Sequence, residues 1–294
     1  MQKPDVKKGM LSTVFPSIRS LATRGLAGWL IILGAVLVTG VVVMTALSPW
    51  ISPHNPSTIN VGIPLQPPNA QFPLGTNDLG QDMLSRIISG GSIMLQVSFL
   101  SVIVCLIIGV PLGLFSSYAG GLIDKGFCLI MDSVYAFPGL VLAIAIAAML
   151  GTGVVNMALS IAVVYVPSYF RVIRSQVLSI KEMSYVEAAS AAGARNRTIL
   201  SRYILPNVVP SIVVVATVNF ADAILTAAGL TFIGLGVPVD IPDWGYDLTN
   251  GRRLLASGSW WVITFPGIMI ILLALGFTLI GEGLSELLNP RLEQ

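Results

Sequence analysis

The chain has 294 residues, of which 54% are hydrophobic and only 10% are charged, and its mean hydropathy is +0.85. Soluble domains carry about a quarter charged residues. A water-soluble fold of this length could not bury so much apolar surface, so lipid must be the solvent. The net charge of +2 is too small to indicate a nucleic-acid partner.

Six apolar runs are long enough to cross the roughly 30 Å hydrocarbon layer as helices. They are rich in Val, Ile and Leu without alternation, which favours helices over barrel strands. The predicted spans are Leu26–Ser48, Ile93–Phe115, Gly126–Leu150, Thr152–Phe170, Asn207–Ile233 and Ser259–Gly281. The first run follows basic residues, as a signal peptide does. It is longer than a signal core and lacks a small-residue cleavage site, so we expect a retained helix. The sequence therefore predicts an all-α membrane protein with six transmembrane helices.

The distribution of Lys and Arg predicts the orientation of these spans. With the N-terminus in the cytoplasm, thirteen of the sixteen basic residues fall on the cytoplasmic side. Only Arg86, Arg252 and Arg253 fall outside. Six spans return the C-terminus to the cytoplasm. This gives four parts: a cytoplasmic segment 1–25, a first helix with its outer loop 26–92, a five-helix core 93–284 containing a cytoplasmic loop 181–206, and a cytoplasmic tail 285–294.

The cytoplasmic loop is polar, helix-prone and basic, and it lies between two apolar runs. Charges in hydrocarbon cost several kcal/mol unless they are compensated, so this loop must protrude into water. Ser184 and Glu187 have the spacing of a capping box, and alanines follow them. Gly193 is expected to end that helix or to permit a left-handed turn, and Asn196 to cap a second helix. The loop is either a docking element for a soluble partner or a well-capped hairpin with no partner.

The spacing of Glu187-Ala188-Ala189, Gly193 and Leu205-Pro206 resembles the EAA loop of ABC importer permeases. In that family the loop forms a coupling helix that sits in a groove of the ATP-hydrolysing subunit. At position 81 the family often has Arg, where this chain has Gln81. Further motifs match, in order and spacing, the second of the two permeases in dipeptide, oligopeptide and nickel systems. They lie at 74–86, 120–138, 230–245, 260–267 and 281–292.

The resemblance implies a type I ABC importer permease fold with a cytoplasmic coupling-helix loop, in the plasma (inner) membrane of a bacterium or archaeon. The implied partners are a second homologous permease, two ABC ATPase subunits and an extracytoplasmic substrate-binding protein. The chain has no Gly-Lys-Ser/Thr phosphate loop, so ATP and Mg are expected on the ATPase subunits, and neither catalysis, a cofactor nor a metal site is expected here. The implied ATPase-coupling residues are Ser184, Tyr185, Glu187, Ala188, Ala189, Ala192, Gly193 and Arg195.

Two carboxylates fall within the predicted spans, where each needs a cavity or a partner. Asp132 lies near the cytoplasmic end of its span, so we expect a structural or gating role there, together with the span-interrupting Pro138. Asp222, with Asn219 one turn earlier, lies near mid-span. We predict that Asn219 and Asp222 line the pore, with a buried structural pairing as the alternative. The arginines that end the fourth span, Arg171 and Arg174, are expected to snorkel towards lipid phosphates.

The sequence also bears on two competing functions. An intramembrane metalloprotease or serine protease needs histidine, and the single histidine, His54, lies outside the spans. A paired-aspartate protease would need Asp132 and Asp222 to meet from different depths. An ion-coupled secondary transporter is disfavoured by the scarcity of intramembrane charge. For an importer we expect peptides or a similar small solute as substrate, with nickel complexes, glutathione, opines and oligosaccharides as the alternatives.

Overall fold

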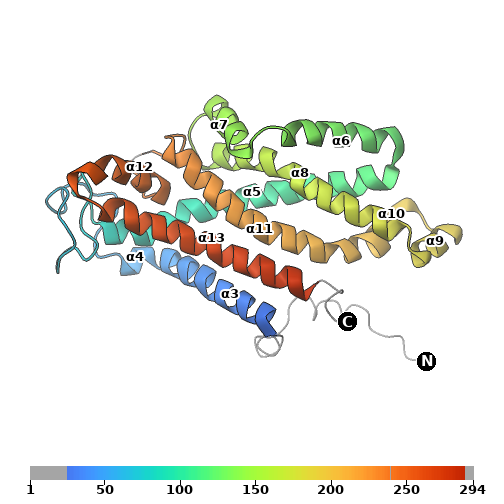
Figure 1. Cartoon of the computed structure of the whole chain (residues 1–294), viewed down its shortest axis with the longest axis horizontal. Coiled ribbons are helices and arrows are strands. Elements are labelled where there is room, and N and C mark those ends of the chain that lie inside the picture. The colour runs from blue at the N-terminus through green and yellow to red at the C-terminus, as the bar shows by residue number, and fades with distance from the viewer. Residues whose placement is uncertain (1–24, 239, 289–294) are drawn as a thin grey trace.

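The computed structural model describes residues 25–238 and 240–288, which form an elongated bundle of helices (Figure 1). The predicted terminal segments lie largely outside this range. Five stretches are long and apolar enough to cross a membrane, and a bent pair of helices makes a sixth if it is counted as one span. The five are α3 (Gly25–Ala46), α5 (Met83–Ala119), α8 (Val154–Lys181), the stretch Asn196–Phe232 that ends in α11 (Leu205–Phe232), and α13 (Trp261–Leu287). The all-α prediction is confirmed.

The predicted third span is not one continuous helix. The chain forms α6 (Gly121–Tyr135) and α7 (Gly139–Leu150), which are bent by 89° relative to each other. Pro138 lies at the break, with φ −55° and ψ 121°, and precedes the first residue of α7. Proline cannot donate a backbone hydrogen bond and disfavours a helical conformation of the residue before it. The apolar run predicted the span correctly as a region but could not show its bend.

Two helices extend well beyond their apolar runs. α5 begins at Met83, ten residues before the predicted start, and α8 continues to Lys181 instead of ending at Phe170. At 1.5 Å per residue, the 37 residues of α5 extend about 55 Å. The hydrocarbon layer is only about 30 Å thick, so part of α5 must project into the aqueous phase. Hydropathy marks the part of a helix that lies in lipid and not its ends.

Close approach between helices holds the bundle together. Tyr169 of α8 packs directly on Gly109 of α5. A β-carbon added at Gly109 would lie only 2.7 Å from the Cβ of Tyr169. α3 packs against α13 in the same way, since a β-carbon at Gly34 would lie 2.5 Å from the carbonyl oxygen of Gly276. Small residues permit such contacts between membrane helices, where the hydrophobic effect does not drive association.

At one end of the bundle, residues 52–82 and α12 (Trp244–Leu254) form a compact outer cap around the beginning of α5 (Figure 1). Trp244 is fully buried and donates from Nε1 to the Ile87 carbonyl at 2.9 Å. Trp261, at the start of α13, donates from Nε1 to the Thr76 carbonyl of the outer loop at 2.9 Å. The cap therefore joins three segments that are distant in sequence.

Candidate functional site

A short helical hairpin lies at the end of the bundle opposite the outer cap (Figure 1). After α8 the chain forms α9 (Ser184–Ala191), then α10 (Asn196–Ile199) and one π-helical turn, Leu200–Ile204, which leads directly into α11. The amide of Leu205 donates to the Leu200 carbonyl five residues earlier. Pro206 follows at once and cannot donate to the carbonyl four residues before it, which accounts for a local departure from α-helical bonding.

Apolar side chains on its inner face fix the hairpin to the bundle. Val186 of α9, Ile199 of α10 and Ile204 are buried together against Ile173 and Ile180 of α8. Tyr118, at the end of α5, donates from its hydroxyl to Asn196 Oδ1 at 3.1 Å. The expected cap role of Asn196 is therefore wrong, because its side chain binds α5 and Arg195 occupies the N-cap position without a side-chain bond. Sequence reasoning also missed the Val186 anchor, although its place between polar neighbours was the available signal.

The turn between α9 and α10 is made by Gly193, which has φ +77°. Its amide donates to the Ser190 carbonyl at 2.9 Å, and the Ala194 amide donates to the Ala189 carbonyl at 3.0 Å. These bonds satisfy carbonyls at the end of α9, as glycine-terminated helices commonly do. The expected left-handed turn at Gly193 is confirmed.

The prediction of a capping box at Ser184 and Glu187 is wrong. α9 begins at Ser184, one residue earlier than a cap at this position requires, and its N-cap residue is Met183 with no side-chain bond. The Glu187 amide makes the first helical bond, to the Met183 carbonyl at 3.2 Å. A residue inside the first turn cannot serve as the N-cap. The Glu187 side chain is consequently free to face water and a cavity of about 310 Å³ that it shares with Tyr118.

The outer face of the hairpin is exposed and largely small. Ala188 of α9 and the C-cap residue Ala192, four positions later, are both exposed, and Ala189 is half-buried. The other residues with an implied coupling role are exposed as well: Ser184, Tyr185, Glu187, Gly193 and Arg195. A rigid, small-residue surface of this kind permits close approach by another protein.

Two ion pairs join α6 to α8, one near the end of α6 that precedes Pro138 and one in the first turn of α6. Asp132 accepts from Arg171 at 2.7 Å, and the Arg171 guanidinium lies 4.0 Å above the centre of the Tyr135 ring. Asp124 is held by both Nε and Nη2 of Arg174, at 2.8 and 2.6 Å. The expectation that both arginines snorkel to phosphates is therefore wrong, because each finds a carboxylate within its own chain. A structural role for Asp132 agrees with this geometry.

The mid-span polar residues lie on α11. Asn219 is only 6% exposed, and its Nδ2 donates to the Val215 carbonyl at 2.9 Å. Asp222 is half-buried, and its carboxylate has no hydrogen bond within the described chain. The hydroxyls of Tyr165 and Thr226 pair at 2.9 Å nearby, and both approach the Asp222 carbonyl. Of the two candidates, Asp222 has the more accessible side chain, and Asn219 lies inside the packed chain.

Buried charge organises the outer cap. Arg86 and Asp247 are fully buried, and Arg86 Nε donates to both carboxylate oxygens at 2.9 and 3.1 Å. The side-chain oxygen of Gln81 accepts a hydrogen bond from Arg86 at 3.0 Å. Gln81 is the position at which the resembling permeases often have Arg. Asp243 accepts from the Tyr246 amide at the start of α12, and burial, reinforced by nearby Asp247, raises the pKa of the Asp243 carboxyl to about 7. The sequence motifs contained these residues but gave no sign of their pairing.

Residues 109–294 match the family described as the binding-protein-dependent transport system inner membrane component. The match includes the hairpin, α11, α12 and α13. The chain belongs to this family. It is therefore a multi-pass inner-membrane permease component of an ABC transporter, and not the ATPase.

Individual relatives agree with this assignment. The dipeptide transport system permease protein DppC of Alkalihalophilus pseudofirmus is 40% identical over 90% of this chain and 86% of its own length. The glutathione transport system permease protein GsiD of Pectobacterium atrosepticum is 39% identical over 77% of this chain and 75% of its own. A solved chain of the inward-facing MetNI methionine ABC transporter aligns with a TM-score of 0.58 at 17% identity, over 70% of this chain and 98% of that one. The last comparison supports the permease fold.

Proposed function

We propose that this chain is the second permease of an ATP-driven peptide importer and forms half of its translocation pore. The observation that carries the proposal is the hairpin: α9 presents exposed Ala188 and Ala192 to water, while Val186 fixes it to the bundle. A partner that moves this hairpin moves α8 and α11 with it. In the assembly, two ATPase subunits dock on such hairpins, one on each of two paired permeases.

Transport follows from a two-state assembly. Nucleotide-driven closure of the ATPases brings the two hairpins together and favours one arrangement of the paired permeases, and hydrolysis releases it. An extracytoplasmic binding protein supplies the substrate on the opposite face. The permease thus contributes a gate whose equilibrium is set by a partner.

The peptide substrate is inferred from relatives. Proteins named as dipeptide or di/tripeptide permeases are 35–40% identical over about nine-tenths of this chain. The glutathione permease named above is similar over a shorter part. A small peptide with free termini is therefore the substrate class to test first.

Uptake by the reconstituted transporter tests this function. Vesicles holding both permeases and the ATPases, with the binding protein outside, should accumulate a radiolabelled dipeptide only when ATP is enclosed. Glutathione and a nickel complex serve as competing substrates. Uptake driven by an ion gradient without ATP would contradict the proposal, and ATP-driven uptake of nickel but not dipeptide would contradict its substrate class.

We further propose that Asp222 faces the translocation path, because a half-buried carboxylate without a partner among the described residues needs water or substrate. Asp222→Asn should lower peptide uptake about tenfold or more while membrane insertion and ATPase binding persist. Val218→Asn, an exposed residue one turn earlier, provides a control for added polarity on the same helix. Unchanged uptake and coupling in Asp222→Asn would refute the pathway role.

Both termini are proposed to be cytoplasmic, as the Lys and Arg distribution predicts. Single cysteines at positions 60 and 250, in a chain without Cys105 and Cys128, should react with a membrane-impermeant maleimide from outside. A cysteine at position 197, on the hairpin, should react only after the membrane is opened. Labelling of position 197 in intact cells would reverse the topology.

A further inference from the structure

The outer loop contains a long stretch without charge. No Asp, Glu, Lys, Arg or His occurs from residue 55 to residue 77. This stretch has irregular backbone and many prolines, and such backbone is not found exposed to the hydrocarbon of a membrane. It therefore lies in water, where an exposed segment of this length would ordinarily carry charges.

Backbone hydrogen bonds make the stretch rigid. The amides of Asn60, Gly62 and Leu65 donate to the carbonyls of Leu79, Gly80 and Asn77 at 2.9 to 3.0 Å. Asn60 and Leu65 both adopt φ +56°, a conformation that non-glycine residues rarely hold unless their surroundings impose it. The buried ring of Phe72 packs directly under Gly62. Residues 57–66, here called the outer platform, are thus fixed before any partner arrives.

The outer platform displays apolar side chains to water. Ile63 is 71% exposed and Ile59 is 57% exposed, and Pro64 beside them is exposed too. Interface cores are depleted of charge and rich in apolar contact, and a surface that is already ordered loses little entropy on binding. Neutral, rigid and apolar, the platform has the properties of a protein-docking surface.

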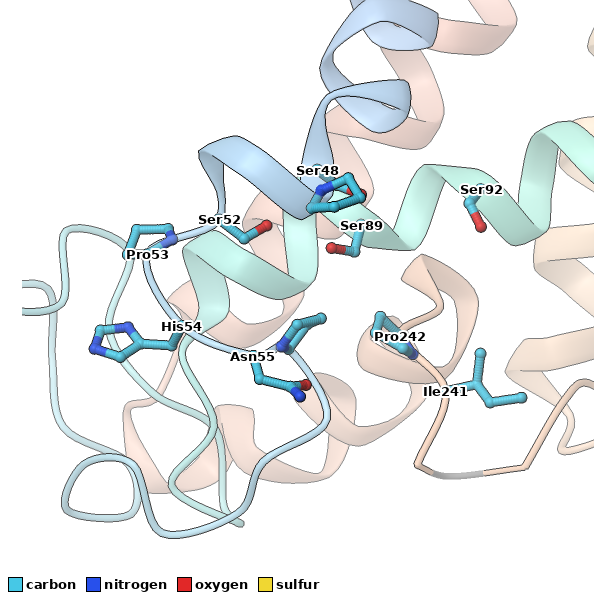
Figure 2. Close-up of a pocket in the computed structure, with 11 residues that line it drawn as sticks. Ser48, Ser52, Pro53, His54, Asn55, Ser89, Ser92, Ile241 and Pro242 are labelled. Carbon is cyan, nitrogen blue, oxygen red and sulfur yellow. The ribbon is translucent and has the colours of Figure 1, made fainter.

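A pocket adjoins the platform (Figure 2). It has a volume of about 580 Å³ and lies between α4 (Ser48–Ile51), the beginning of α5 and the segment around Pro242. Ser57 of the platform donates to the Asp240 carbonyl at 2.7 Å and so joins the two features. Hydroxyl and amide groups line the pocket together with four prolines, and the Oγ of Ser52 is buried there without a hydrogen-bond partner among the described residues. The His54 ring points away from the pocket and pairs with Asp82 at 3.2 Å (Figure 2). Such a lining suits a neutral polar group, for example a peptide backbone, better than an ion.

We propose that the outer platform is a docking surface for the binding protein, with the neighbouring pocket receiving a neutral loop of that partner. This inference rests on the proposed function, since it names the surface through which substrate delivery occurs. The platform lies at the end of the bundle opposite the hairpin, where the ATPases dock (Figure 1). The family is described as dependent on a binding protein, which must approach from this aqueous side.

The test uses the complete transporter in lipid nanodiscs and its purified binding protein. Ile59→Lys and Ile63→Lys should each weaken binding at least tenfold, and the double variant about a hundredfold, because each places an unpaired charge in the contact. Basal ATP hydrolysis and co-purification of the second permease should not change. Leu255→Lys makes the same change at an exposed residue that belongs neither to the platform nor to the pocket lining, and should alter binding less than twofold.

A photo-crosslinking amino acid at position 63 gives a second readout that does not depend on a destabilising charge. It should form its adduct with the binding protein. An adduct with the second permease or with lipid, or wild-type affinity in both lysine variants, would overturn the platform assignment. If the binding protein fails to stimulate ATP hydrolysis even in the wild-type transporter, the proposed function fails instead, so the two failures are distinguishable.

Discussion

Ala188→Arg is expected to detach the ATPase subunits from the transporter. Ala188 is exposed on α9 and forms, with Ala192, the small face on which a partner groove would close. An arginine there places a long side chain and an unpaired charge in a buried contact, which costs several kcal/mol. A loss of about 3 kcal/mol lowers affinity more than a hundredfold. Co-purification of the ATPases and substrate-stimulated ATP hydrolysis should both be lost, while the permease still inserts, because no span is changed.

Two further variants make this result specific. Ala188→Ser preserves the small size and should retain assembly. Gly193→Asp should also uncouple the transporter, because it places bulk and charge in the partner contact. Within this chain a β-carbon at Gly193 would meet nothing within 4 Å, so the hairpin itself should still form. Wild-type assembly, hydrolysis and uptake in both Ala188→Arg and Gly193→Asp would show that the hairpin is not the coupling element.

Arg86→Met is expected to destabilise the outer cap by about 3–5 kcal/mol, because it leaves Asp247 as an uncompensated buried charge. Hydrogen exchange in residues 52–82 should accelerate, and limited proteolysis should cut that loop first. The effect should be largest in the cap, since the affected contacts join α5, α12 and the loop at Pro56. Uptake should fall together with cap stability.

The partner substitution separates charge from packing. Arg86→Met combined with Asp247→Leu removes both charges and should recover most of the lost stability, as apolar replacements of buried pairs often do. Arg253→Met, at an exposed position of α12, should change stability by less than about 0.5 kcal/mol. A double variant as unstable as the two single changes combined would mean that shape, and not charge, holds the cap together.

Sequence patterns predicted the spans and the hairpin for definite physical reasons. Apolar runs are a property of the chain alone, and the left-handed turn at Gly193 follows from the one residue type without a β-carbon. The bend between α6 and α7 was only partly foreseeable. Proline at position 138 indicated a kink, but the angle depends on how α7 packs on α8 and α11.

Pairing between distant residues could not be predicted in this way. Arg86 and Asp247 are separated by 161 positions, and Arg174 and Asp124 by 50. Nothing local in the sequence indicates which charges meet, because the pairing is decided by the tertiary arrangement of α5, α6, α8 and α12. The capping box failed for a smaller reason: a shift of one residue in the start of α9 moves Ser184 from the cap into the helix.

The continuity of helix from Asn196 to Phe232 makes α10, the π-turn and α11 a lever arm. Its 37 residues extend about 55 Å, so a tilt of about 5° at the hairpin displaces the far end by about 5 Å. That end is tied to α12 by Thr249, whose hydroxyl donates to the Phe232 carbonyl at 2.9 Å. Two hydrogen-bonded peptide chains lie about 4.8 Å apart. If the ATPases move the hairpin as proposed, a rotation too small to reorder the hairpin would displace the outer end of α11 by about one interstrand spacing.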